Sequence, residues 1–497
     1  MPDKIVLRDH RNAVDKVYVG FPPNGSSIKP VHIASGALRT IYGAYNTTIN
    51  IKRLALVSDS KGHTPTGNEI DTIFDRLLED ESIEDSVSIE ALDSMRSVMQ
   101  KLLSVDKGVY IVSGLKDGMI SYSAGSKFFL TKHAMYEDAG EFIGSVIKTY
   151  CPELANHISK ILNEAKDPIS LLFKPVLEED METFESNRHE DIPAFNGNNA
   201  VCKWFVDGVR ASGTSLKNSL EQHANPLTQL RLFNFYCIFQ IIRYMALLEA
   251  FYCNENIRPI LLDFTGKAPS QSSVARASEM SYTQLYKSLN RFYAWAYANE
   301  FENLSRAEML QSETPVYEVI ANPSKAKKEK TSKDELDALW AMAKERASGT
   351  ETDDDLRLVF GETAYDMLAL EASSNPVIYI KALGTAAGIL YPPDKSHPNK
   401  RFVLSQDVLE MLLRCCVNPE EVLSGAELRA RLWDRFGIII GGSNFEIDKL
   451  QKSGMILQVD EDSLEENFSD FASILEAMDF AEEMADGILQ IRFGGKA

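Results

Sequence analysis

The sequence contains few cysteines, and their spacing indicates neither a disulfide framework nor a metal site. The six are Cys151, Cys202, Cys237, Cys253, Cys415 and Cys416; no CxxC pair occurs, and the adjacent pair does not suit an ordinary disulfide. Such usage is typical of buried thiols in a reducing compartment. The opening segment, MPDKIVLRDH, lacks the apolar core of a signal peptide. We therefore predict a cytoplasmic protein.

Long apolar runs are also missing. The most apolar stretch is Leu227–Phe251, and Arg231 and Arg243 leave an uncharged run of only 11 residues between them. A helix that crosses a membrane needs about 20 apolar residues. We predict a buried helix here and no membrane partner.

No known catalytic motif is present. Gly266-Lys267 has Leu261 where a P-loop needs its first glycine and Ala268 where it needs Ser or Thr. The eight histidines form no HxH, HExxH or HxxxH pair, and no G-x-S-x-G sequence occurs. We predict a non-catalytic protein with no metal site and no cofactor. An enzyme whose site is assembled from distant residues, around Asp59 or the Asp263–Arg276 loop, remains an alternative.

The length and composition of the chain are those of an ordinary globular protein. The chain has 497 residues, of which 44% are apolar and 25% charged, enough for several cores. We predict an α+β protein with a mixed α/β N-terminal domain, a helical middle domain and a C-terminal winged-helix-like domain. The predicted boundaries are 1–177 for the first domain, 178–199 for an acidic linker, 200–321 for the second domain, 322–335 for a basic linker and 336–497 for the last domain, whose C-terminal segment is acidic.

Local patterns predict the main elements. Alternating or β-branched residues predict strands at Lys16–Gly20, Ile49–Val57, Val109–Ser113, Met119–Ser123 and Lys127–Thr131. Apolar residues at helical spacing predict helices at Asn68–Glu79, Ser88–Leu103, Ala139–Tyr150 and Val274–Asn299, as well as a long helix that begins at Pro226.

The C-terminal region has the order of a winged helix. Ser405 is predicted to cap a first helix, Ser424-Gly-Ala-Glu427 forms a capping box for a second that Gly437 can close, and a third covers about Asn444–Ser453. We expect strand Met455–Val459 to pair with Ile488–Phe493, with a helix over Leu464–Met484 as an insertion. In the third helix, Glu446 and Asp448 cancel Lys449 and Lys452. A winged helix that reads DNA brings cations to the phosphates, so protein binding is favoured over the alternative, a DNA-binding regulator.

Charge is unevenly distributed along a chain of net charge −20. Residues 16–58 carry five basic and no acidic side chains, whereas residues 441–497 carry 13 acidic and 4 basic ones. The basic segment supplies candidate nucleic-acid contacts at Lys29, Arg39, Lys52 and Arg53. A second candidate anion site lies where a helix begins, where free backbone N–H groups favour an anion. Its residues are Lys267, Ser270, Ser272, Ser273 and Arg276.

The run Arg401–Gly442 (RFVLSQDVLEMLLRCC…LSGAELRARLWDRFGIIIGG) resembles a C-terminal module of accessory proteins encoded beside bacterial anti-phage defence genes, including methylation-associated systems with ATP-driven DNA translocases. Ile260–Trp295 adds a second, fainter similarity. The resemblance covers under a tenth of the chain strongly and brings no catalytic residue. It implies an accessory subunit in an antiviral complex, with an ATPase, a nuclease or a methyltransferase as protein partner and DNA as a further candidate partner. Neither the resemblance nor the residues indicate the oligomeric state.

Overall fold

The computed structural model describes residues 5–23, 28–46, 126–130, 137–167, 181–317, 326–370, 375–454, 459–484 and 489–493, apart from residues 187, 224, 255 and 395. It also describes residues 170–171 and scattered positions between 71 and 94. The predicted strands Ile49–Val57, Val109–Ser113 and Met119–Ser123 lie outside this part of the chain, as do half of the helix predicted at 68–79 and most of the helix predicted at 88–103.

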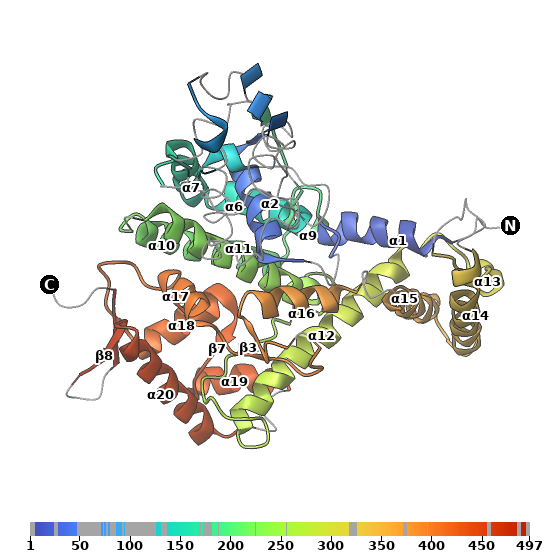
Figure 1. Ribbon diagram of the computed structural model, residues 1–497. Coiled ribbons are helices and arrows are strands. Elements are labelled where there is room, and N and C mark those ends of the chain that lie inside the picture. The colour runs from blue at the N-terminus through green and yellow to red at the C-terminus, as the bar shows by residue number, and fades with distance from the viewer. Residues whose placement is uncertain are drawn as a thin grey trace.

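The described protein is mostly helical, with a few short strands, and α11 (Pro226–Glu249) lies at its centre (Figure 1). Asn225 accepts the Leu227 N–H at the start of this helix, and Pro226 occupies its first turn as predicted. Its neighbours come from both halves of the chain: α2 (Pro30–Tyr42), α6 (Asp138–Tyr150), α10 (Ala200–Leu220), α12 (Ser273–Asn299), α16 (Pro376–Ala386) and α17 (Gln406–Arg414). Pro226–Cys253 is long and apolar enough to cross a membrane, but 89% of its apolar window is buried inside the structure. This is the packing of a core helix in a soluble protein, as predicted for this segment.

The N-terminal helices pack on α10 and α11 as a layer of α2, α6 and α7 (Pro152–Glu164). Glycine permits an unusually close crossing between α2 and α6. A Cβ atom on Gly140 would lie 2.3 Å from the carbonyl oxygen of Ile33, and one on Gly36 would lie 2.3 Å from that of Glu137. No side chain fits in that space, so these glycines set the distance between the two helices.

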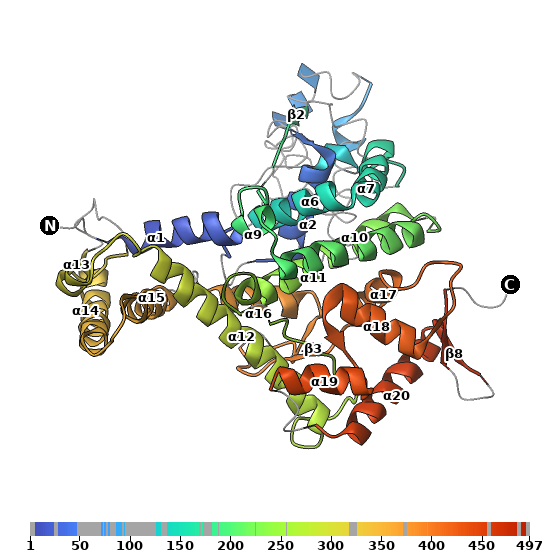
Figure 2. The same cartoon turned by 180° about the vertical axis from the view of Figure 1, so that it is seen from behind.

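A helical arm extends to one side of the molecule (Figures 1 and 2). It consists of α13 (Arg306–Gln311), α14 (Ala326–Ser348) and α15 (Asp353–Ala369), with α15 packed along α12. The N-terminal helix α1 (Leu7–Val14) reaches the base of this arm, where the Leu7 N–H donates to the Val316 carbonyl over 2.8 Å.

The C-terminal part combines short strands with three capped helices. Parallel strands β3 (Ile260–Leu261) and β7 (Ile438–Ile439) lie beside α12, and β4 (Leu390–Tyr391) pairs with β5 (Arg401–Phe402). A three-stranded antiparallel sheet has the order β6-β9-β8. Its strands are β6 (Leu423–Ser424), β8 (Ala481–Glu483) and β9 (Leu489–Ile491), and the accompanying helices are α18 (Gly425–Phe436), α19 (Asn444–Lys452) and α20 (Glu461–Ala477).

Asn467 fastens α20 to the β3–β7 pair. Its amide donates to the carbonyl oxygens of Leu262 and Ile440 over 3.0 and 2.7 Å, and its side-chain oxygen accepts the Phe264 N–H. The residue is completely buried. One amide side chain therefore satisfies three backbone groups at the ends of two strands.

Several sequence predictions about local structure are confirmed. Helix α6 covers the predicted Ala139–Tyr150, and α12 covers the predicted Val274–Asn299, with the Ser272 side chain as its N-cap. The capping box of Ser424 and Glu427 forms at the start of α18, and Gly437 closes that helix with a φ of 72°. Ser405 occupies the N-cap position of α17, but its side chain makes no capping bond.

Other predictions are wrong. Lys16–Gly20 was predicted as a strand, but Asp15–Val19 forms a π-helical turn, η1, that continues α1 and ends at Gly20. Lys127–Thr131 was also predicted as a strand, whereas Lys127–Phe129 forms a 3-10 turn, η3, capped by Ser126. The strand predicted at Met455–Val459 lies almost wholly outside the described residues, and β9, which falls within its predicted partner Ile488–Phe493, pairs with β6 and β8. The helix predicted to reach Met484 ends at Ala477, and β8 follows it.

The two predicted linkers contain regular structure. In 178–199, β2 (Met181–Thr183) pairs with β1 (Ala44–Asn46), and α9 (Pro193–Asn196) follows after the buried His189. Helix α14 begins at Ala326, inside the predicted basic linker. A continuous core of buried apolar side chains extends from Leu7 to Ile491. The division into three domains stays a prediction.

Candidate functional site

The predicted anion site before α12 is occupied by contacts within the protein. The Lys267 ammonium donates to a Glu466 carboxylate oxygen over 2.8 Å, and an Arg276 N–H donates to the Pro269 carbonyl oxygen. The Ser272 hydroxyl accepts the Ala275 N–H as a helix cap. Ser270 lies in the turn before the helix, and Ser273 is the first residue of α12. The lysine therefore already faces a carboxylate, whereas Arg276 donates to a neutral carbonyl.

The Asp263–Arg276 loop also lacks the features of an active site. Asp263 is 1% exposed and pairs with Arg401 over 2.6 Å. Another oxygen of Asp263 accepts the Thr265 N–H and hydroxyl. These contacts fix the loop against β5, so Asp263 has a structural part in the fold. The other proposed centre, Asp59, lies outside the described residues.

Of the four N-terminal basic residues predicted to contact nucleic acid, the described part of the chain contains Lys29 and Arg39. Arg39 is completely buried, and its guanidinium pairs with Glu137 over 2.5 Å and with Glu141 over 2.6 Å. The prediction that Arg39 contacts nucleic acid is therefore wrong, because no external phosphate can reach it. Lys29 precedes α2 at its N-cap. Lys52 and Arg53 lie outside the described part of the chain.

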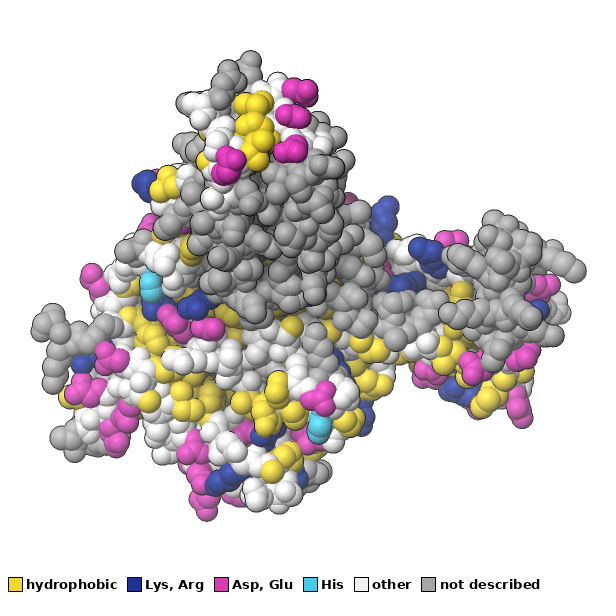
Figure 3. All heavy atoms as spheres, viewed as in Figure 1, with side chains coloured by type: hydrophobic (Ala, Val, Ile, Leu, Met, Phe, Trp, Pro, Cys, Tyr) yellow, Lys and Arg dark blue, Asp and Glu magenta, His cyan; other side chains and the backbone are white. Residues whose placement is uncertain are grey.

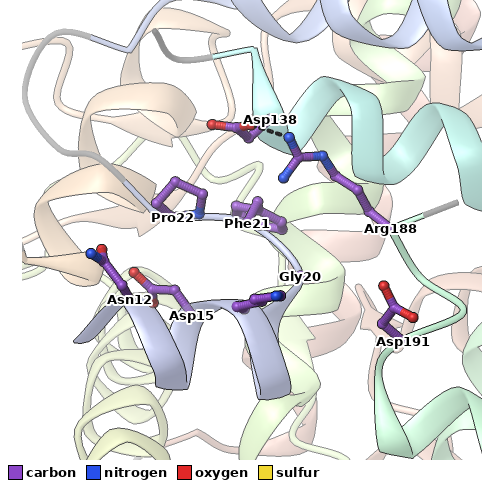
Figure 4. Close-up of a pocket in the computed structure, with 9 residues that line it drawn as sticks. Asn12, Asp15, Gly20, Phe21, Pro22, Asp138, Arg188 and Asp191 are labelled. Carbon is purple, nitrogen blue, oxygen red and sulfur yellow. Dashed lines mark hydrogen bonds and ion pairs between the residues drawn. The ribbon is translucent and has the colours of Figure 1, made fainter. Parts of the chain in front are cut away.

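A cavity of about 360 Å³ lies where η1, the N-terminus of α6 and the loop before α9 meet (Figure 4). Its volume is within the range of small-molecule sites. Carboxyl groups, an amide, two cations and an apolar turn surround it. The lining residues are Asn12, Asp15, Lys16, Gly20, Phe21, Pro22, Asp138, Arg188 and Asp191.

Asp15 is the most perturbed group of this cavity. It is 2% exposed, and burial raises its pKa from 3.8 to about 7 despite the opposing effect of Arg11. Its two side-chain contacts among the described residues are long: 3.3 Å to the Arg11 Nε and 3.4 Å to the Tyr293 hydroxyl. Charge-assisted hydrogen bonds are usually about 2.7–2.9 Å long, so neither contact compensates the buried carboxylate fully.

The opposite wall of the cavity belongs to a network of charged side chains. Arg188 donates to Glu141 over 2.8 Å and also to Asp138, at the start of α6. Glu141 in turn pairs with the buried Arg39. Burial is the main cause of a raised pKa at Asp138, although Arg188 opposes it. Arg188 is thus neutralised by two carboxylates before any ligand arrives.

A turn of fixed shape forms the apolar side of the cavity. Gly20 has a φ of 86°, and a Cβ atom there would lie 2.8 Å from the Phe142 ring. The Phe21 ring packs against Phe142, Tyr244 and Tyr379. The turn is therefore anchored in the core, and its position does not depend on a ligand.

A second candidate site is an acidic surface along α20 and β8, which we call the acidic edge. Magenta side chains gather at this side of the molecule in Figure 3. It comprises Glu461, Asp462, Glu465, Glu466, Asp470, Glu476, Glu482 and Glu483. Among the described residues, three cations pair with Glu465, Glu466 and Glu482; they are Arg429, Lys267 and Arg492. Eight carboxylates against three cations leave this surface strongly negative.

Sequence reasoning missed the cavity, because its residues come from three separate segments and form no motif. Asp15 had one local signal: a carboxylate between Val14 and Val17 in an apolar stretch. Nothing local indicated that Tyr293, far along the chain, would cover it. Among the described residues, no three His, Cys, Asp or Glu side chains come close enough together to hold a metal ion.

Comparisons with known proteins add no functional assignment: no protein-family model matches the chain, and no curated protein matches it.

Proposed function

We propose that this protein is a cytoplasmic, non-catalytic subunit that docks a basic partner protein through the acidic edge of a winged-helix-like module. The observation that carries this proposal is the charge of α20, which bears six carboxylates and no basic residue. A surface of this kind attracts a Lys/Arg-rich protein segment and repels phosphate.

The strand and helix order supports the winged-helix part of the proposal. Helix α17 precedes β6, α18 follows it, and the β8–β9 hairpin packs beside β6 in the order β6-β9-β8. Because helix α20 comes directly before that hairpin, we propose that it is the third helix and that α19 is the insertion, which is the reverse of the assignment made from the sequence.

This assignment counts against the alternative of a DNA-reading regulator. In a DNA-reading module the helix before the wing enters the major groove and its cations contact phosphates. The exposed side chains of α20 include Glu461, Asp462 and Glu465. Bringing them to a DNA backbone would add like-charge repulsion where DNA binding requires neutralisation.

The larger assembly is proposed on the resemblance of Arg401–Gly442 to accessory proteins of bacterial anti-phage defence. In that setting the basic partner would be an ATPase, a nuclease or a methyltransferase, and DNA would be held by the partner. An enzyme with an unrecognised site has weaker support, because Asp263 and Lys267 are held in ion pairs within the protein.

The test is affinity purification of the tagged full-length protein from its host at low salt, with co-purifying proteins identified by mass spectrometry. The variant Asp462→Lys/Asp470→Lys/Glu483→Lys reverses three carboxylates that form no ion pair among the described residues. A matched control, Asp334→Lys/Asp337→Lys/Glu345→Lys, makes the same change in charge on exposed residues of α14.

We expect a stoichiometric partner that is lost with the α20–β8 variant, retained with the α14 control and released by salt. A partner that both variants retain would refute docking at the acidic edge. Specific binding of duplex DNA by the purified protein alone would instead favour the regulator.

A further inference from the structure

The cavity beside η1 has more negative charge than its own cations compensate. Three aspartates line it, against Lys16 and Arg188. Arg188 already pairs with Asp138 and Glu141, so it contributes no spare positive charge. Asp15 and Asp191 remain, against Lys16 in the lining and Arg11, which pairs with Asp15 over 3.3 Å from outside the lining. Asp191 is exposed and forms no ion pair with any described residue.

Asp15 provides the second, independent indication of a ligand. A carboxylate that is 2% exposed needs strong partners, yet its two contacts with the protein measure 3.3 and 3.4 Å. It lines a cavity that a small molecule can enter. A cationic group in the cavity would supply the compensation that Arg11 provides only in part.

The arrangement of the aspartates determines which kind of cation fits. Asp15 and Asp191 lie on opposite sides of the cavity, with Gly20 between them (Figure 4). They do not converge, and no three acidic, Cys or His side chains of the described chain come close enough to bind one metal ion. Mg²⁺ and Ca²⁺ require several oxygen ligands around a single point. Two separated carboxylates instead match two separated positive charges.

We propose that this cavity binds a short linear diamine, with one ammonium group at Asp15, the other at Asp191, and the carbon chain against the Gly20–Pro22 turn. Three carboxylates disfavour an anion here, and the apolar turn gives the methylene groups a surface to cover. The site is separate from the acidic edge and does not depend on the proposed docking function.

Binding should depend on pH through Asp15. The charged and polar groups that face it are Arg11 from α1, Tyr293 and Tyr297 from α12, and Lys16, Asp138, Arg188 and Asp191 around the cavity. Its pKa of about 7 means that the carboxylate needed for an ammonium group forms as the pH rises through neutrality. Primary ammonium groups stay protonated to about pH 10, so affinity should rise between about pH 5.5 and about pH 8.5.

The experiment titrates the full-length protein with putrescine and follows the ligand by saturation-transfer NMR. Butylamine and butanediol, which have similar carbon chains but one and no charge, serve as reference ligands. The variants Asp15→Asn and Asp191→Asn each remove one proposed contact. Asp207→Asn, an exposed aspartate of α10 outside the cavity lining, controls for general attraction to an acidic protein.

We expect saturable putrescine binding that exceeds butylamine binding and is not seen with butanediol. Each cavity variant should weaken it by about tenfold or more, the Asp207 variant should not, and Asp15→Asn should remove the rise with pH. Equal loss in the Asp207 variant, equal binding of butanediol, or no saturable binding at either pH would overturn the proposal.

Discussion

Replacing Asp15 by Asn should stabilise the protein at neutral and alkaline pH. Burial raises the pKa of Asp15 from 3.8 to about 7, so the folded state holds this proton more tightly than the unfolded state. The native state therefore loses stability as the pH rises from about 4, and the full cost is present above about pH 7. A tenfold difference in proton affinity corresponds to about 1.4 kcal/mol, which makes the cost about 4 kcal/mol at most.

Asparagine keeps the shape of the side chain and can still accept hydrogen bonds from Arg11 and Tyr293, but it carries no charge. We expect the variant to be more stable than the wild type at about pH 8, by up to about 4 kcal/mol, and to match it near about pH 4. Thermal midpoints of the variant and the wild type, measured in parallel across this pH range, report their difference in stability. Ionisations elsewhere in the chain affect both proteins equally. A difference that stays constant with pH, or a variant less stable at about pH 8, would refute the reasoning.

Three further predictions concern stability, each measured by urea denaturation against a matched control. Asn467→Leu leaves three buried backbone groups without a partner and should cost about 2–4 kcal/mol, whereas Ser469→Ala on the exposed side of α20 should change stability by under about 0.5 kcal/mol. Gly140→Ala forces a Cβ atom into the backbone of α2 and should cost about 1–3 kcal/mol or more, while Gly197→Ala, whose nearest neighbour would lie 3.8 Å away, should be nearly neutral. Arg39→Met leaves Glu137 buried without its cation and Glu141 paired with Arg188 alone, and should cost about 3–5 kcal/mol, against under about 1 kcal/mol for Arg210→Met in an exposed pair. In each case, a control variant that loses as much stability as the variant it is matched with would contradict the stated cause.

Features that depend on neighbouring residues could be predicted from the sequence. A capping box needs only Ser424 and Glu427, three positions apart, and a helix end needs only Gly437. The central helix is similarly clear, because its residues are apolar on nearly every side and Pro226 marks its start. By contrast, Val17 and Val19 alternate with polar or aromatic residues as in a strand, yet they continue a helix. The close packing of η1 against the core decides its structure, and this lies beyond any local pattern.

Counting charges by region misled the search for a site because charges act as pairs, and pairs form between distant segments. Residues 16–58 contain no acid, but the acidic partners of Arg39 lie 98 and 102 positions further along the chain. The same holds for Lys267, whose partner Glu466 is 199 positions away. When charges are counted within one stretch of sequence, each of these cations adds to an excess of positive charge. In the fold, a distant carboxylate neutralises it. The reverse applies to Asp15: its charge has a cationic neighbour four positions away, yet burial leaves it poorly compensated. Charges that keep no adequate partner after folding are the ones available to a ligand, and in the described chain Asp15, Asp191 and the acidic edge meet that condition.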